Sequence, residues 1–183
     1  MVVGRHPERR GVYPGSFDPP TVAHVAISVA AIEHHGLANL TWMVSTTALG
    51  KETANHPPMA ERLEVLAAVA ADVPGLEVAV TDAQLLADIA EDFDLVVMGA
   101  DKWHQIHEER WYDDERHRRA TLTRLPTAAI VARAGSAGIP DELRLPLDDR
   151  FADVSSTRAR AGEVDLMAPA ARAHALRTGR WLA

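Results

Sequence analysis

Residues 15–24 of this chain read Gly15-Ser16-Phe17-Asp18-Pro19-Pro20-Thr21-Val22-Ala23-His24. The apolar residues 11–14 before this stretch predict the end of a buried strand, and residues 25–33 after it predict a helix. A turn between a strand and a helix gathers unpaired backbone N–H groups and the positive end of the helix dipole at one point. That arrangement favours an anion such as a nucleotide phosphate, and Thr21 and His24 can add a hydroxyl and an imidazole to it.

Strand and helix patterns alternate along the rest of the chain. Apolar runs predict strands over 40–45, 76–80, 95–98 and 128–131, and a short edge strand over 143–147. Helices are predicted from 59 to the Pro74-Gly75 stop, over 83–91 with a cap at Thr81 or Asp82, and over 169–177 before Gly179. We expect one α/β domain over residues 1–183, a Rossmann-like, doubly wound parallel sheet, with 1–10 as a candidate flexible extension.

Three polar segments each follow a predicted strand. They are residues 15–24, the loop that begins at Thr46, and Gly99-Ala100-Asp101. In an open parallel sheet, ligands bind beyond the carboxyl ends of the strands, near the point where the strand order reverses. We therefore expect all three segments to face one crevice.

Composition excludes several classes of site and partner. The chain has no cysteine, so disulfides, thiolate metal sites and cysteine nucleophiles are excluded. The 26 acidic residues outnumber the 19 lysines and arginines, giving a formal charge of −7, which disfavours a nucleic-acid partner but allows a local pocket for a small nucleotide. His104 and His107 lack the carboxylates or thiolates that would complete a metal site, so we expect no metal ligands from the protein.

The distribution of apolar residues speaks against a membrane partner. No apolar run approaches the roughly 18–20 residues that a bilayer-crossing helix needs. No apolar region of a secretory signal follows the arginines within residues 1–10. We expect a cytoplasmic protein with small-molecule nucleotide partners, and we leave open whether it forms a homo-oligomer.

Two segments resemble the signatures of the nucleotidyltransferase superfamily, which has a cytidylyltransferase-like fold and transfers a nucleoside monophosphate from a nucleoside triphosphate. Residues 15–24, the first signature, resemble G-x-F-D-P-x-[HT]-x-G-H, with Thr21 where many members carry histidine and Ala23 where glycine is usual. Residues 154–160, the second signature, read Val-Ser-Ser-Thr-Arg-Ala-Arg and resemble I-S-S-T-x-x-R. Two matches in the right order are much stronger than either one alone.

The resemblance implies that both signatures hold the triphosphate. The residues concerned are Gly15, Ser16, Phe17, Thr21 and His24 in the first signature and Ser155, Ser156, Thr157 and Arg160 in the second. His24 and Arg160 are the candidate catalytic residues, with Lys51 as a third candidate in the loop after the second strand. The alternative is structural: a helix-capping histidine, a plain serine cap and surface cations.

A second resemblance points to the pyridine mononucleotide adenylyltransferases. Gly99-Ala100-Asp101 is similar to their G-x-D element, which implies that Gly99 and Asp101 contact the ATP ribose. Trp111-Tyr112 is similar to an element whose indole stacks on the pyridine ring, and residues 125–135 resemble a strand and arginine-glycine turn of that subfamily. Thr46 and Trp103 are further candidates for binding the acceptor, although hydrophobic packing is the commoner role of a tryptophan.

The sequence thus predicts an enzyme that transfers AMP from ATP to nicotinate or nicotinamide mononucleotide in NAD biosynthesis, with Mg²⁺ bound to the ATP. Two alternatives stay open. One is another nucleotidyltransferase of the same fold, such as a phosphopantetheine adenylyltransferase or a cytidylyltransferase. The other is a nucleotide-binding module without catalysis, which Ala23 and the long spacing from Asp101 to Trp111 would allow.

Overall fold

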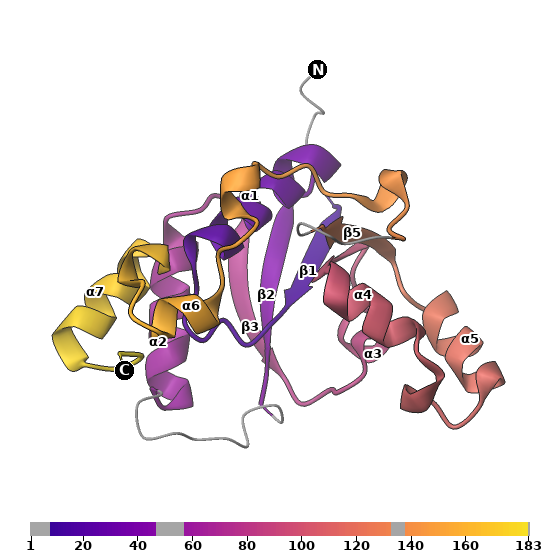
Figure 1. Ribbon diagram of the computed structural model, residues 1–183. Coiled ribbons are helices and arrows are strands. Elements are labelled where there is room, and N and C mark those ends of the chain that lie inside the picture. The colour runs from indigo at the N-terminus through magenta and orange to yellow at the C-terminus, as the bar shows by residue number, and fades with distance from the viewer. Residues whose placement is uncertain (1–7, 47–56, 133–137, 183) are drawn as a thin grey trace.

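A five-stranded parallel sheet forms the centre of the molecule (Figure 1). The computed structural model describes residues 8–46, 57–132 and 138–182. The strands are β1 (Arg10–Pro14), β2 (Asn39–Ser45), β3 (Leu76–Thr81), β4 (Leu95–Gly99) and β5 (Thr127–Val131), in the order β3-β2-β1-β4-β5. The chain runs outward from β1 to β3 and then returns to place β4 beside β1, so the strand order reverses there. The predicted doubly wound sheet is confirmed.

Helices cover both faces of the sheet. One face packs against α1 (Val22–His35) and α2 (Met59–Ala71), and the other against α3 (Leu86–Ile89), α4 (Ala100–His107) and α5 (Glu115–Thr123). The helices α6 (Ser156–Arg160) and α7 (Pro169–Thr178) pack beside α2 (Figure 1). Short 3₁₀ turns, η2 to η5, span Glu109–Trp111, Asp141–Leu143, Asp149–Phe151 and Val164–Leu166. Within the described ranges, no helix has the length and apolar character that crossing a membrane requires.

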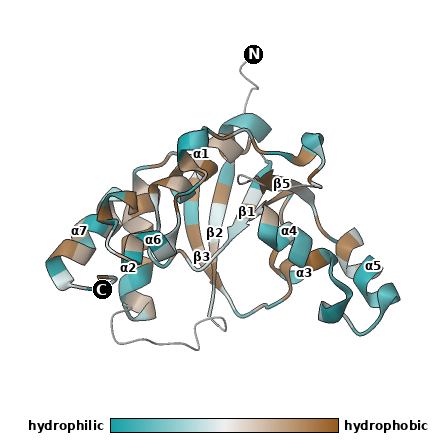
Figure 2. Ribbon diagram, in the orientation of Figure 1, coloured by the Kyte–Doolittle hydropathy of each residue, from teal (hydrophilic) through white to brown (hydrophobic). Residues whose placement is uncertain are grey.

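Apolar side chains of the central strands are buried on both faces. In β4, Leu95 and Val97 pack on the α1 side, and Val96 and Met98 pack on the α4 side. Each of the four is at most 3% exposed. In Figure 2 brown segments alternate with white and teal ones along the strands, β5 is brown, and the outer helix α5 is largely teal. Uninterrupted apolar runs, rather than alternating ones, are expected of parallel strands with helices on both sides, which is why these runs predicted the sheet correctly.

The helix predicted over 83–91 is shorter than expected. Thr81 Oγ1 accepts a hydrogen bond from the N–H of Ala83 at 3.1 Å, and Leu85 is still extended, with ψ of 134°. A local side-chain bond of this kind competes with helix formation. The helix therefore covers only Leu86–Ile89.

The short edge strand predicted over 143–147 was wrong. Asp141–Leu143 forms a 3₁₀ turn, and the segment meets β5 only through the bridge of Arg144 with Ile130 and the bond from Leu145 N to Ile130 O, at 2.9 Å. Pro146 follows at once and has no N–H with which to continue a ladder.

His35, at the end of α1, makes stability dependent on pH. Its Nε2 is buried and has no hydrogen-bond partner in the part of the chain that the structure describes. Burial, followed by the charges of His34 and Arg9, lowers the pKa of His35 from 6.5 to about 4. Unfolded His35 therefore takes up a proton that the folded chain resists, so the free energy of unfolding falls as pH drops from about 6.5 to 4.

We expect His35→Gln to weaken this acid sensitivity. A shift of this size corresponds to about 3 kcal/mol, and the partial exposure of the ring reduces our expectation to about 1–2 kcal/mol. Urea unfolding between pH 7 and pH 4.5 measures the difference. His104→Gln, at an exposed position, is the control and should keep the wild-type slope. Equal slopes for wild type and His35→Gln would contradict the prediction.

Candidate active site

The first signature builds the start of α1 through reciprocal hydrogen bonds. Thr21 is the N-cap residue; its Oγ1 accepts from the N–H of His24 at 3.4 Å, and its own N–H donates to His24 Nδ1 at 2.9 Å. This is a capping box in which an imidazole replaces the usual glutamate. Because a backbone N–H can only donate, Nδ1 accepts, and the neutral ring carries its proton on Nε2. His24 is thereby prepared to donate from Nε2.

Buried aromatic rings support the imidazole. Phe17 is 1% exposed, and its ring lies edge-on to His24 with centroids 5.1 Å apart and stacks on Trp42 at 4.4 Å. Trp42 Nε1 donates to Ser28 Oγ, and Ser28 Oγ donates to the carbonyl of His24, both at 2.8 Å. The Phe17 ring therefore packs against the imidazole and helps to fix its orientation. Because this ring is buried, Phe17 can contact a ligand directly only through its backbone.

The β1–α1 loop (residues 15–21) is held through its backbone carbonyls. Groups from α2, from α6 and from the segment before α7 donate to four of these carbonyls: Arg62 Nη2 to Ser16, Arg160 Nη1 to Asp18, Ser156 Oγ to Pro19 at 2.8 Å, and Ala168 N to Pro20 at 2.9 Å. The two signatures, far apart in sequence, are thus in direct contact, as the resemblance requires.

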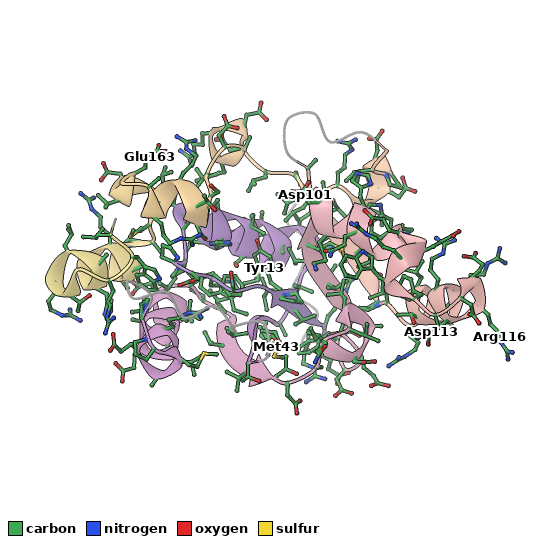
Figure 3. All side chains as sticks on the ribbon, turned by 60° about the horizontal axis from the view of Figure 1, so that its bottom comes forward. Tyr13, Met43, Asp101, Asp113, Arg116 and Glu163 are labelled. Carbon is green, nitrogen blue, oxygen red and sulfur yellow. The ribbon has the colours of Figure 1, made fainter. Side chains whose placement is uncertain are left out.

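The second signature divides its polar groups between the loop and the solvent side. Ser156 commits its hydroxyl hydrogen to Pro19, whereas Ser155 accepts from Arg158 N at 3.2 Å and keeps its own hydroxyl hydrogen for another acceptor. Thr157 is exposed. Arg160 has further N–H groups besides the one that meets Asp18, because a guanidinium carries five. Arg158 instead pairs with Glu163, which Figure 3 places at the outer edge beside α6.

A cavity of about 650 Å³ lies at the carboxyl edge of the sheet, against the same loop. Gly15 and Ser16 contribute to its lining, together with Met43 at the end of β2 and Lys102, Trp111 and Tyr112 from the α4–α5 side. Met43 lies near the centre of the molecule in Figure 3. Among the described lining residues, Lys102 is the one with a charged side chain. The cavity is otherwise largely apolar and suits a flat ring with an anionic group.

Trp111 presents its indole at the mouth of this cavity. The side chain is 50% exposed, and the Arg110 guanidinium lies 5.0 Å from the ring centroid while it pairs with Glu108 at 2.5 Å. Beside it, the Tyr112 hydroxyl donates to Ile106 O at 2.6 Å, and burial raises the pKa of Tyr112 despite the nearby Arg118. An exposed indole above an apolar cavity is well placed to stack on a ligand ring.

Other predicted site residues do not reach this cavity. Gly99 is the N-cap of α4, and Asp101 is exposed in its first turn. Trp103 packs against His107, with centroids 4.3 Å apart, and against the apolar cluster under α4, so its packing interpretation is favoured. Thr46 is exposed and bonds to the Thr81 carbonyl through its N–H and its hydroxyl, at 2.8 and 3.3 Å. Lys51 lies outside the described residues.

Ala23 meets no conformational obstacle. It is buried in the first turn of α1, and the non-glycine residues with positive φ in the described chain are Phe17 and Trp181. A methyl group at a helical position costs nothing in backbone freedom. The departure from glycine at this position therefore leaves the loop geometry intact.

Sequence reasoning missed Arg62, which is 3% exposed although it is charged. Its Nε lies 3.7 Å from Asp18 Oδ1, and burial lowers the pKa of Arg62 while Asp18 opposes that change. A signal was present, because Arg62 lies four residues before Leu66, on the face of the helix that the apolar pattern buries. A cation on a core-facing helix position indicates a buried carboxylate or carbonyl partner.

The chain is similar in sequence to known nucleotidyltransferases. The family model described as Cytidylyltransferase-like matches residues 12–162. A probable nicotinate-nucleotide adenylyltransferase of Rhizobium etli is 31% identical over 138 residues, covering 69% of this chain and 68% of the relative. One of the same name from Brucella abortus is 30% identical over 168 residues, covering 81% and 82%.

A solved structure shares the fold. The nicotinic acid mononucleotide adenylyltransferase of Plasmodium falciparum, complexed with NaAD, matches with a TM-score of 0.59 and 13% identity over 94% of this chain and 97% of that one. The parallel sheet, the contact between the two signatures and the extent of the matching family model lead to one conclusion. The chain belongs to the cytidylyltransferase-like family of nucleotidyltransferases.

Proposed function

We propose that this chain is an adenylyltransferase that transfers AMP from ATP to a pyridine mononucleotide, preferentially nicotinate mononucleotide, in NAD biosynthesis. One observation carries the proposal: the loop that contacts Arg160 and precedes His24 also lines the cavity in which Trp111 is exposed. A triphosphate and a pyridine ring can therefore bind on either side of one loop. The relatives named nicotinate-nucleotide adenylyltransferases support the same acceptor.

The reaction needs alignment and charge stabilisation rather than a covalent intermediate. A phosphate oxygen of the mononucleotide attacks the α-phosphorus of ATP, a new P–O bond forms, and the bond from the α-phosphorus to the bridging oxygen breaks to release pyrophosphate. His24 donates from Nε2 to an α-phosphate oxygen, and the remaining N–H groups of Arg160 bind the departing phosphates. Both donors are held before the substrate binds, so little reorganisation is required.

Mg²⁺ enters this proposal with the nucleotide. Over the described ranges, no three histidine, aspartate or glutamate side chains gather into a group that could hold a metal ion. Mg²⁺ commonly retains several waters and binds through substrate phosphates. The cytoplasmic location and the lack of a nucleic-acid partner stay predictions, and homo-oligomer formation stays open.

Lys102 supports nicotinate over nicotinamide as the base of the acceptor. It is the charged side chain among the described residues that line the cavity. Nicotinate carries a carboxylate on the ring, whereas nicotinamide carries a neutral amide. A cation beside an apolar wall favours the charged ring over its neutral analogue.

The test is pyrophosphate release from Mg-ATP with each acceptor. We expect turnover with nicotinate mononucleotide and a lower kcat/KM with nicotinamide mononucleotide. No turnover with either would refute the proposal. Turnover only with phosphopantetheine, or with CTP in place of ATP, would instead assign the chain to another branch of the family.

Trp111→Ala should raise the KM for the acceptor about tenfold, since stacking of a base on an aromatic side chain contributes about 1–3 kcal/mol. The KM for ATP should change little. Trp111→Phe should restore part of the loss because it keeps a flat ring. The matched control is Trp103→Phe, because Trp103 packs against the apolar cluster under α4. This substitution should leave the KM for the acceptor unchanged. An acceptor KM that does not respond to Trp111→Ala would remove Trp111 from the site.

A further inference from the structure

The carboxylate of Asp18 is buried and meets two side chains from distant parts of the chain. Trp181 Nε1 donates to Asp18 Oδ1 at 2.5 Å, and Arg62 Nε lies 3.7 Å from the same oxygen. Trp181 is 1% exposed, Arg62 3% and Asp18 9%. Trp181 follows α7, so the end of the described chain reaches back to the loop after the first strand.

The backbone of Trp181 adopts a conformation that a large side chain rarely takes. Its φ is +62°, in the left-handed region, two residues after Gly179, which caps α7 with φ of +74°. Non-glycine residues persist there only where the surroundings determine the conformation, and such positions gather at functional sites. Here, the indole packs in one buried cluster with Val65, Ala171 and Ala175.

Asp18 is held both through its side chain and through its backbone carbonyl. Trp181 and Arg62 meet the side chain of Asp18, and Arg160 meets its carbonyl. Asp18 lies between Ser16, which lines the cavity, and Thr21, which orients His24. A displacement of Asp18 would therefore change the separation between the acceptor cavity and the imidazole.

We propose that Trp181 is a positioning residue for the β1–α1 loop: its indole N–H holds the Asp18 carboxylate so that Ser16 and His24 keep the spacing that two bound phosphates require. The inference rests on the proposed function of that loop. It assigns a role to the C-terminal segment beyond its packing against α2 and α6. A role in packing alone would predict lower stability with unchanged activity for each folded molecule.

Trp181→Phe separates the two roles, because phenylalanine keeps an aromatic ring in the cluster and loses the N–H. We expect kcat/KM for ATP to fall about tenfold, since the lost bond is one to a charged acceptor, and ATP affinity measured by calorimetry to fall with it. Val65→Ala is the matched control: it loosens the same buried cluster but leaves the N–H in place. It should lower Tm comparably while keeping kcat/KM and ATP affinity.

Wild-type ATP affinity and kcat/KM in Trp181→Phe, with only Tm reduced, would overturn the inference. Calorimetry with ATP needs no acceptor, so it remains decisive even if no acceptor supports turnover and the proposed function fails. Should Trp181→Phe not fold, the indole N–H resonances of the wild-type chain provide a second measurement. We expect the Trp181 resonance to lie downfield of the other three and to move on ATP binding; a resonance unaffected by ATP would equally overturn the inference.

Discussion

His24→Ala is expected to lower kcat by about 10²- to 10³-fold while the protein stays folded, since removal of one preorganised donor to a developing oxyanion typically costs that much. The structure explains why the donor is preorganised: the Thr21 N–H occupies Nδ1 at 2.9 Å, and the Phe17 ring supports the imidazole. Single-turnover rates with saturating ATP measure the loss directly. Thermal unfolding should show only the modest effect of a weakened helix cap.

His24→Gln provides the matched control. A glutamine at this third helical position can still accept from the Thr21 N–H, so the capping box and the stability should be retained. The amide cannot reproduce the imidazole Nε2 geometry, and we expect most of the rate loss to remain. If His24→Ala retained turnover within about threefold of wild type, the imidazole would be only a helix cap.

The sheet was predictable because its sequence signal is local and repeated. Each strand that is buried on both faces reads as an apolar run, as in Leu95-Val96-Val97-Met98, and the helices between the runs require parallel connections. The failures were also local. The Thr81 side chain delayed α3 because its hydrogen bond to the N–H of Ala83 outweighed the apolar pattern. Pro146 ended the pairing beside β5 because it has no N–H to donate to the next ladder bond.

The family resemblance predicted that the two signatures meet, but individual contacts of the candidate site were predictable only where the residues are neighbours in sequence. Thr21 and His24 lie three residues apart, so a helix start already places them together. Nothing in the sequence shows that the hydroxyl of Ser156 meets the Pro19 carbonyl, or that Trp181 meets Asp18, because these contacts depend on how α6 and α7 pack beside α2. Contacts of that kind require the tertiary structure.

The sequence also could not decide which of the two candidate tryptophans, Trp103 and Trp111, is exposed. Trp103 lies within α4 on the side that packs against the apolar cluster, whereas Trp111 follows the end of that helix in a 3₁₀ turn and stays half exposed. Both residues fit a stacking role by composition alone. Whether each tryptophan is packed or exposed depends on where α4 ends, which is at His107. A helix end cannot be located from sequence to within the few residues that separate His107 from Trp111.

Arg160→Ala is expected to lower kcat/KM for ATP by about 10²- to 10³-fold, because it removes both a cation for the phosphates and a donor to the Asp18 carbonyl. Arg160→Lys should keep the charge but recover only part of the activity, since an ammonium cannot bind two oxygens in one plane. Calorimetry with ATP and thermal unfolding separate the two contributions. The lost bond to the Asp18 carbonyl should lower the free energy of unfolding by about 1–3 kcal/mol. We expect the loss of ATP affinity to be larger than this loss of stability would explain.

Arg158 supplies the control for this prediction, two residues away in the same short helix. Its guanidinium is paired with Glu163 and donates to Asp153 O at 2.8 Å, on the exposed side of α6. Arg158→Ala should therefore change kcat/KM for ATP by less than about threefold, as expected for an exposed ion pair. Equal effects of the two substitutions would mean that the second signature binds phosphate through its hydroxyls and backbone alone, and that Arg160 only holds the loop.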